Sequence, residues 1–137
     1  MKRLHNKTCV ITGAARGIGS AISKAFKNEG ATVIITDVDY QSAQETAARL
    51  EAKAFELDVE NEAHWNALQE RYPEIDVLVN NAGITGFEDS SASQNPELAT
   101  LEDWRRVHRV NLDGTFLGCR YGIKAMRGGF VRLTALF

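Results

Sequence analysis

The sequence predicts an α/β fold in which helices cover both faces of a parallel sheet. Short apolar runs typical of buried strands alternate with segments whose apolar residues recur at helical spacing. A glycine-rich turn, residues 12–19, joins the first strand to the first helix, and most later connections are short. This alternation is typical of parallel strands joined by right-handed crossovers, and a chain of 137 residues corresponds to one domain, residues 1–137.

The first half of the chain shows the alternation most clearly. We expect strands over residues 8–12, 31–36 and 54–57, and helices over 18–28 and 40–50. Ile18, Ile22 and Phe26 share one face of the first helix, and Gly30 is a stop signal. The second strand contains a continuous β-branched run suited to a strand that is covered on both faces. Asp39 is placed to cap the second helix.

The second half continues the pattern around one long loop. Asn61 is placed to cap a helix that ends near residue 70, and residues 76–79 form a fourth strand. The polar segment 86–100 is expected to be a loop, of a length that is often functional. Thr100 and Asp103 form a capping-box pattern before a helix that runs to about residue 126. A glycine pair ends that helix, and residues 130–134 form a fifth strand.

The turn Thr12-Gly13-Ala14-Ala15-Arg16-Gly17-Ile18-Gly19 has the composition of a phosphate-binding turn. Glycine lets the backbone approach a pyrophosphate, and the N–H groups at a helix start donate hydrogen bonds to it. Asp37, at the end of the second strand, is placed to accept hydrogen bonds from a ribose. The simpler alternatives are an ordinary strand-to-helix turn and a loop carboxylate without a ligand.

Composition argues against several other classes of protein. The net charge is −2 without a basic cluster, so nucleic acid is not the expected partner. We expect no membrane segment and no signal peptide, and we expect Cys9 and Cys119 to be unpaired thiols of a cytoplasmic protein. The three histidines are scattered, so no metal site is expected.

Four separated motifs give the chain a family resemblance. They are the turn with Gly13, Gly17 and Gly19, the pair Asp58-Val59, the run Asn80-Asn81-Ala82-Gly83, and Asn111 within Val110-Asn111-Leu112-Asp113-Gly114. In this order the sequence resembles the N-terminal half of a short-chain dehydrogenase/reductase. The resemblance implies a Rossmann-type doubly wound sheet in three layers, with strand order 3-2-1-4-5. The C-terminal strands and helices of the family would be absent, so we expect a chain truncated after strand five.

The resemblance also implies roles for individual residues. The cofactor-binding residues would be Gly13, Ala15, Arg16, Gly17, Ile18, Gly19, Asp37, Val38, Asp58, Val59, Asn80, Ala82 and Gly83. Asn111 matches the catalytic asparagine of the family, which helps to position a water in the proton relay. The residues themselves also permit structural readings: Asp58 as a helix cap, Asn80 as a brace of the sheet, and Asn111 at a helix kink.

Asp37 and Arg16 bear on the choice of nicotinamide cofactor in opposite ways. A carboxylate suits two ribose hydroxyls and repels a 2′-phosphate, because two unit charges about 4 Å apart interact by roughly 4 kcal/mol at an effective dielectric constant of about 20. Arg16 favours NADP, because some NADP-dependent members of the family carry a basic residue at that position. We expect NAD, with NADP as the alternative.

The remaining catalytic residues of the family have no match in this sequence. The family places Tyr-x-x-x-Lys on the helix after strand five and a serine at the end of that strand, whereas here Tyr121 and Lys124 are one residue too close and Ala135 takes the serine position. Thr134 could supply one hydroxyl. With the chain ending at strand five, we expect an open sheet edge and a partly uncovered apolar helix face that includes Trp104, a surface open to homo-oligomer formation.

Two functions follow as alternatives. The first is an NAD(H)-dependent oxidoreductase that transfers hydride between nicotinamide and an alcohol or ketone substrate. The second is a non-catalytic dinucleotide-binding fragment or pseudoenzyme that lacks the Ser, Tyr and Lys. A methyltransferase with a similar sheet is a third reading, which the glycine spacing and the run Asn80–Gly83 disfavour.

Overall fold

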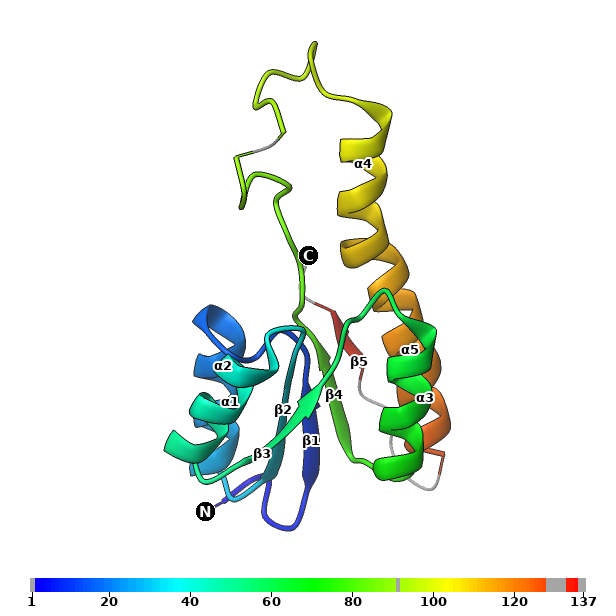
Figure 1. Cartoon of the computed structure of the whole chain (residues 1–137). Coiled ribbons are helices and arrows are strands. Elements are labelled where there is room, and N and C mark those ends of the chain that lie inside the picture. The colour runs from blue at the N-terminus through cyan, green and yellow to red at the C-terminus, as the bar shows by residue number, and fades with distance from the viewer. Residues whose placement is uncertain (1, 91, 128–132, 136–137) are drawn as a thin grey trace.

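The computed structural model describes residues 2–90, 92–127 and the backbone of 133–135. A five-stranded sheet lies between two groups of helices, as the sequence predicts (Figure 1). Its elements are β1 (Thr8–Ile11), α1 (Gly17–Asn28), β2 (Thr32–Asp37), α2 (Tyr40–Arg49), β3 (Lys53–Glu56), α3 (Glu62–Arg71), β4 (Val77–Asn80), α4 (Leu101–His108), a π-helical segment (Arg109–Asp113), α5 (Gly114–Ala125) and β5 (Leu133–Ala135).

The sheet is parallel and its strand order is β3-β2-β1-β4-β5, which confirms the predicted order. Val10 of β1 lies opposite Ile34 of β2 on one side and Leu78 of β4 on the other. The chain adds β2 and β3 on one side of β1 and then β4 and β5 on the other, so the strand order switches between β1 and β4. In open α/β sheets, ligands bind at the carboxyl ends of the strands at such a switch point.

Alternation along the strands divides the core into two layers. Val10, Ile34 and Leu78 pack on the α3 and α5 side, whereas Ile11 and Ile35 pack on the α1 and α2 side. Each of these five side chains is fully buried. Because successive strand residues point to opposite faces, a continuous apolar strand supplies both layers at once.

The predicted helix caps are confirmed. Asp39 accepts a hydrogen bond from the backbone of Ser42 at the start of α2, and Asn61 accepts one from Ala63 at the start of α3. Thr100 forms a complete capping box with the third residue of α4. Within the described part of the chain, no helix has the length and apolar character needed to cross a membrane.

The long helix predicted after residue 100 is interrupted. A π-helical segment, Arg109–Asp113, separates α4 from α5. A π-helical turn places an extra residue in the helix and is frequently found at functional sites. The predicted fifth strand, 130–134, is described only from Leu133, and residues 130–132 lie outside the described residues.

Side-chain burial corrects one expectation about the helices. Trp65 of α3 is buried, whereas Trp104 of α4 is 63% exposed and stacks on His108. The apolar face of the helix after residue 100 is expected from the sequence to be partly uncovered. Leu117 and Tyr121 on α5 are buried, because α5 packs on α3 and the sheet.

Candidate functional site

Three segments meet where β1, β2 and β4 end. The glycine turn follows β1, Asp37 closes β2, and the Asn80–Gly83 run begins at the last residue of β4. The sheet register places them together, because Ile11 pairs with both Ile35 and Val79. This edge of the sheet is the candidate cofactor site.

Two glycines of the turn are required by close packing. Gly13 has φ +60°, and a methyl group on it would lie 2.8 Å from Cα of Ala82. A methyl group on Gly19 would lie 2.5 Å from the carbonyl oxygen of Gly13. The turn therefore packs directly on the segment after β4, and the first helix packs directly on the turn.

Thr12 and Asn81 join the glycine turn to the segment after β4. The Thr12 hydroxyl accepts hydrogen bonds from the backbone N–H groups of Asn81 and Ala82, both at 3.0 Å. The Asn81 side chain donates in return to the carbonyl oxygens of Thr12 at 2.9 Å and Gly13 at 3.1 Å. Sequence reasoning did not assign these two roles; the available signal was a polar residue at the end of each apolar strand.

Asp37 lies against the glycine turn and is only 9% exposed. Its Oδ2 accepts a hydrogen bond from the Ala15 amide at 3.1 Å, and its Oδ1 accepts one from the Asp39 amide at 3.1 Å. The carbonyl oxygen of Ala15 accepts a hydrogen bond from the Thr46 hydroxyl at 2.6 Å. A carboxylate has about four acceptor sites, so these two amides leave capacity for ribose hydroxyls.

Other residues of the turn face open space. A methyl group on Gly17 would meet no atom within 4 Å, and its φ is +56°. Ile18 is 70% exposed at the start of α1, and Val38 is 65% exposed after β2. The amides of the first turn of α1 have no partner within the helix, so this opening fits a pyrophosphate and an adjacent ribose.

Asp58 and Val59 follow β3 and form a tight turn. The Asp58 amide donates to Nδ1 of His64 at 3.0 Å, and its Oδ1 accepts from the Glu60 amide at 3.1 Å. Val59 is 7% exposed and packs so closely on α5 that a methyl group on Gly114 would lie 2.6 Å from it. Sequence reasoning found no role for His64, which acts here as a hydrogen-bond acceptor that fixes the turn.

Asn80 closes β4 and is 4% exposed. Its Nδ2 lies 3.8 Å from the sulfur of Cys119, and its side chain packs against Gly118, where a methyl group would overlap the Asn80 oxygen. These contacts support the reading of Asn80 as a brace between the sheet and α5. Ala82 and Gly83 lie beyond it, on the side of the glycine turn and of Asn111.

Asn111 lies in the π-helical segment and holds the chain that follows Gly83. Its Oδ1 accepts from the Ile84 amide at 2.8 Å, and its Nδ2 donates to the Ile84 carbonyl oxygen at 2.9 Å. A methyl group on Gly83 would lie 3.3 Å from Oδ1 of Asn111. Asn111 therefore lies where the regular helix is interrupted and beside Gly83, and its assignment to the site stays a prediction.

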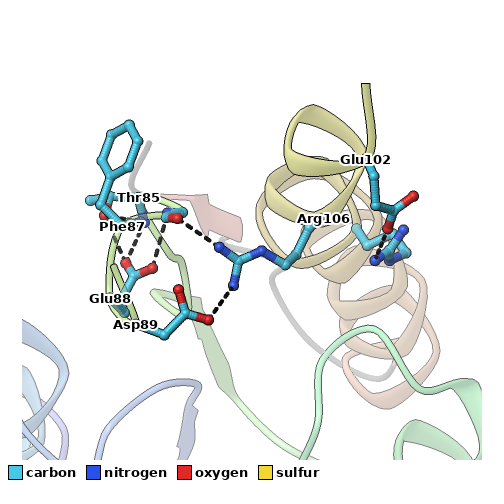
Figure 2. Close-up of polar contacts among 8 residues, drawn as sticks. Thr85, Phe87, Glu88, Asp89, Glu102 and Arg106 are labelled. Carbon is cyan, nitrogen blue, oxygen red and sulfur yellow. Dashed lines mark hydrogen bonds and ion pairs between the residues drawn. The ribbon is translucent and has the colours of Figure 1, made fainter. Parts of the chain in front are cut away.

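A second contact holds the same segment two residues further on. Nη2 of Arg106 donates to the Gly86 carbonyl oxygen at 2.6 Å, and Nη1 lies 3.4 Å from Asp89 (Figure 2). Glu88 closes the turn by accepting from the amides of Thr85 and Gly86 at 2.5 and 2.9 Å. Hydrogen bonds to this carboxylate, first that of the Thr85 amide, lower the pKa of Glu88 below its usual value.

Tyr121 and Lys124 do not form a catalytic pair. Tyr121 is 3% exposed, and its hydroxyl donates to the carbonyl oxygen of Tyr72 at 2.9 Å. Burial raises the pKa of Tyr121 far above its usual value. The tyrosine is therefore part of the core. Among the described residues, no group of His, Cys, Asp and Glu side chains is arranged to hold a metal ion.

Comparison with known proteins places this geometry in a family. The family model described as enoyl-(acyl carrier protein) reductase matches residues 13–136. The NADP-dependent (R)-specific alcohol dehydrogenase of Lentilactobacillus kefiri is 37% identical over 91% of this chain and 50% of its own length. The 3-beta-hydroxysteroid dehydrogenase of Comamonas testosteroni is 37% identical over 91% of this chain and 49% of its own length.

A solved structure shows the same arrangement. The 3-ketoacyl-(acyl-carrier-protein) reductase of Brucella melitensis, crystallised with NADH, superposes with a TM-score of 0.83 at 31% identity, over 96% of this chain and 57% of its own. The chain thus spans about half the length of the relatives that it matches. On this evidence the chain belongs to the short-chain dehydrogenase/reductase family and corresponds to the N-terminal portion of its members.

Proposed function

We propose that this chain binds NAD(H) at the edge where β1, β2 and β4 end, as the cofactor-binding half of an oxidoreductase. The amides that begin α1 would hold the pyrophosphate, and Asp37 would accept hydrogen bonds from the adenosine ribose. Asp58 and Val59 would flank the adenine. Bound nicotinamide supplies hydride transfer to or from an alcohol or ketone carbon. Asn111 would act beside it by positioning a water.

The observation that carries the proposal is the position of Asp37. Its carboxylate is 9% exposed and is tied to the glycine turn through the Ala15 amide at 3.1 Å. A fixed carboxylate at this position favours ribose hydroxyls and opposes a 2′-phosphate, because a dianion would have to lie beside an existing negative charge. The proposal is therefore NAD in preference to NADP.

Titration calorimetry with NADH and NADPH tests this proposal. We expect NADH to bind more tightly than NADPH by at least tenfold, which corresponds to about 1.4 kcal/mol. Asp37→Ala should weaken NADH by about tenfold or more, because a charge-assisted hydrogen bond contributes about 1.5–3 kcal/mol. Asp113→Ala, which removes a carboxylate in the π-helical segment, serves as the control. Absence of binding at millimolar NADH would refute the proposal.

The second candidate is a dinucleotide-binding module without turnover. It is supported by the contacts of Tyr121, whose hydroxyl donates to the Tyr72 carbonyl oxygen within the core. NADH oxidation with a panel of ketones separates the two functions. Binding of NADH without oxidation by this chain would favour the second candidate.

A further inference from the structure

Arg16 and Asp39 form an ion pair across the two loops beside the proposed ribose site. Nη2 of Arg16 lies 3.1 Å from Oδ2 of Asp39. Arg16 immediately precedes α1, and Asp39 caps α2. Each is close in sequence to a residue of the proposed site, since Arg16 follows Ala15 and Asp39 lies two residues after Asp37.

The carboxylate of Asp39 is the fixed member of this pair. Its Oδ1 accepts from the Ser42 amide at 3.1 Å, and its Oδ2 accepts from the Ser42 hydroxyl at 2.7 Å. These two hydrogen bonds, aided by Arg16, lower the pKa of Asp39, so its negative charge is present at neutral pH. The backbone amide of Asp39 is also fixed, because it donates to Asp37 at 3.1 Å. The Arg16 side chain is long and 72% exposed, so it is the Arg16 guanidinium that moves to meet the fixed Asp39 carboxylate.

The pairing changes what Arg16 offers to a ligand. A guanidinium is well suited to a phosphate, because its planar N–H groups form two parallel hydrogen bonds. In this chain one of those N–H groups is directed to Asp39. Two carboxylates and one guanidinium then surround the site, so the local charge is negative where a 2′-phosphate would need a positive partner.

We infer that Asp39 is a second determinant of cofactor choice, which acts by engaging the guanidinium that would otherwise bind the 2′-phosphate of NADP. The inference rests on the proposed function, since it concerns the same cofactor site. It also reconciles the opposite cofactor preferences that Asp37 and Arg16 suggest. Asp37 favours NAD directly, and Arg16 loses its preference for NADP because its guanidinium is paired with Asp39. Exposed ion pairs are modest in strength, so Asp39 tunes the preference that Asp37 establishes.

The test compares NADH and NADPH binding to Asp39→Asn and to Glu45→Gln. Asparagine is a good helix cap, so Asp39→Asn retains the start of α2 while it removes the charge that holds Arg16. We expect NADPH affinity to rise roughly fivefold and NADH affinity to stay within about twofold. Glu45→Gln removes an equal charge from α2, at a residue whose carboxylate accepts from Gln41, and should leave the ratio of the two affinities unchanged.

Arg16→Gln and the double variant Arg16→Gln/Asp39→Asn complete the experiment. If the gain in NADPH affinity depends on a released guanidinium, Asp39→Asn should produce no gain when Arg16 is absent. An equal gain in NADPH affinity in the Arg16→Gln background would overturn the inference, and so would an unchanged ratio of the two affinities in Asp39→Asn. In either case, NADH binding by the unaltered chain would still uphold the proposed function. Asp39→Ser, a neutral residue that also caps helices, should reproduce the asparagine result if the asparagine variant folds poorly. Failure of the unaltered chain to bind NADH overturns both.

Discussion

Asn111 engages both backbone polar atoms of Ile84, accepting from its N–H at 2.8 Å and donating to its C=O at 2.9 Å. One side chain thus supplies the pairing that a neighbouring strand would supply. Ile84 is the first residue after the Asn80–Gly83 run, so this contact sets the direction of the chain as it leaves the site. The contact links the geometry of the π-helical segment to the geometry of the sheet edge.

Asn111→Ala should lower the free energy of unfolding by about 2 kcal/mol, because two partly buried hydrogen bonds of about 1 kcal/mol each are lost. Urea denaturation followed by circular dichroism measures the change. Asn66→Ala, at an exposed position of α3, is the matched control and should change stability by less than about 0.5 kcal/mol. Equal midpoints for the two variants would show that Asn111 does not anchor the segment after Gly83.

Thr12→Val tests the link between the glycine turn and the segment after β4. Valine has nearly the same shape as threonine but accepts no hydrogen bond, so the amides of Asn81 and Ala82 both lose the partner shown at 3.0 Å. We expect a loss of about 2–6 kcal/mol, since each of the two unsatisfied amides costs about 1–3 kcal/mol. Thr12→Ser retains the hydroxyl and should cost clearly less. A serine variant as unstable as the valine variant would indicate that the methyl group, not the hydroxyl, is important.

Gly13→Ala and Gly17→Ala should separate stability from binding. Both residues have positive φ, so alanine is strained at either position by about 1–2 kcal/mol. Only Gly13 would also place its methyl group 2.8 Å from the backbone of Ala82, whereas Gly17 faces open space. We therefore expect Gly13→Ala to be the less stable variant in thermal unfolding, and Gly17→Ala to remain folded but to lose most of its NADH affinity. Full NADH affinity in Gly17→Ala would place the pyrophosphate elsewhere.

The sequence predicted the sheet well because local patterns determine it. The β-branched run of β2 and the strand-glycine-helix junction at Gly13 each depend on residues next to one another. The order of the strands came from the family resemblance, whereas the right-handed crossovers determine which face of the sheet each helix covers. Asp37 could be placed at the carboxyl end of the sheet from its position after the second apolar run, whereas the positions of Asn80 and Asn111 were implied only by the family resemblance.

Other features depend on residues that are distant in sequence, and these could not be predicted. The hydrogen bonds of Asn111, in the π-helical segment, join it to Ile84, 27 positions earlier in the chain. The pairing of Arg16 with Asp39 depends on how two loops meet across 23 positions. Tyr121 lies on the helix face expected to be partly uncovered, yet it is buried, since periodicity shows which residues share a face but not what covers that face.

Asp76 provides a test of acid stability. Burial alone would raise its pKa, but hydrogen bonds from the Thr8 amide at 2.8 Å and the Lys7 ammonium at 3.0 Å outweigh that effect and lower it. A pKa that is lower in the folded state means that the carboxylate stabilises the fold above its unfolded pKa of about 3.9. That contribution is lost as the pH falls through the lower, folded-state pKa.

Asp76→Asn should therefore be less stable than the unaltered chain at pH 7, by about 1 kcal/mol or less because the side chain is 37% exposed. The difference should shrink towards pH 3 and below, where the unaltered carboxylate also becomes neutral. Urea denaturation at pH 7, 5 and 3 measures it. Glu74→Gln, which removes an exposed carboxylate two residues earlier, is the control for net charge. A difference between Asp76→Asn and the unaltered chain that stays constant or widens on acidification would mean that the Asp76 charge does not stabilise the start of β1.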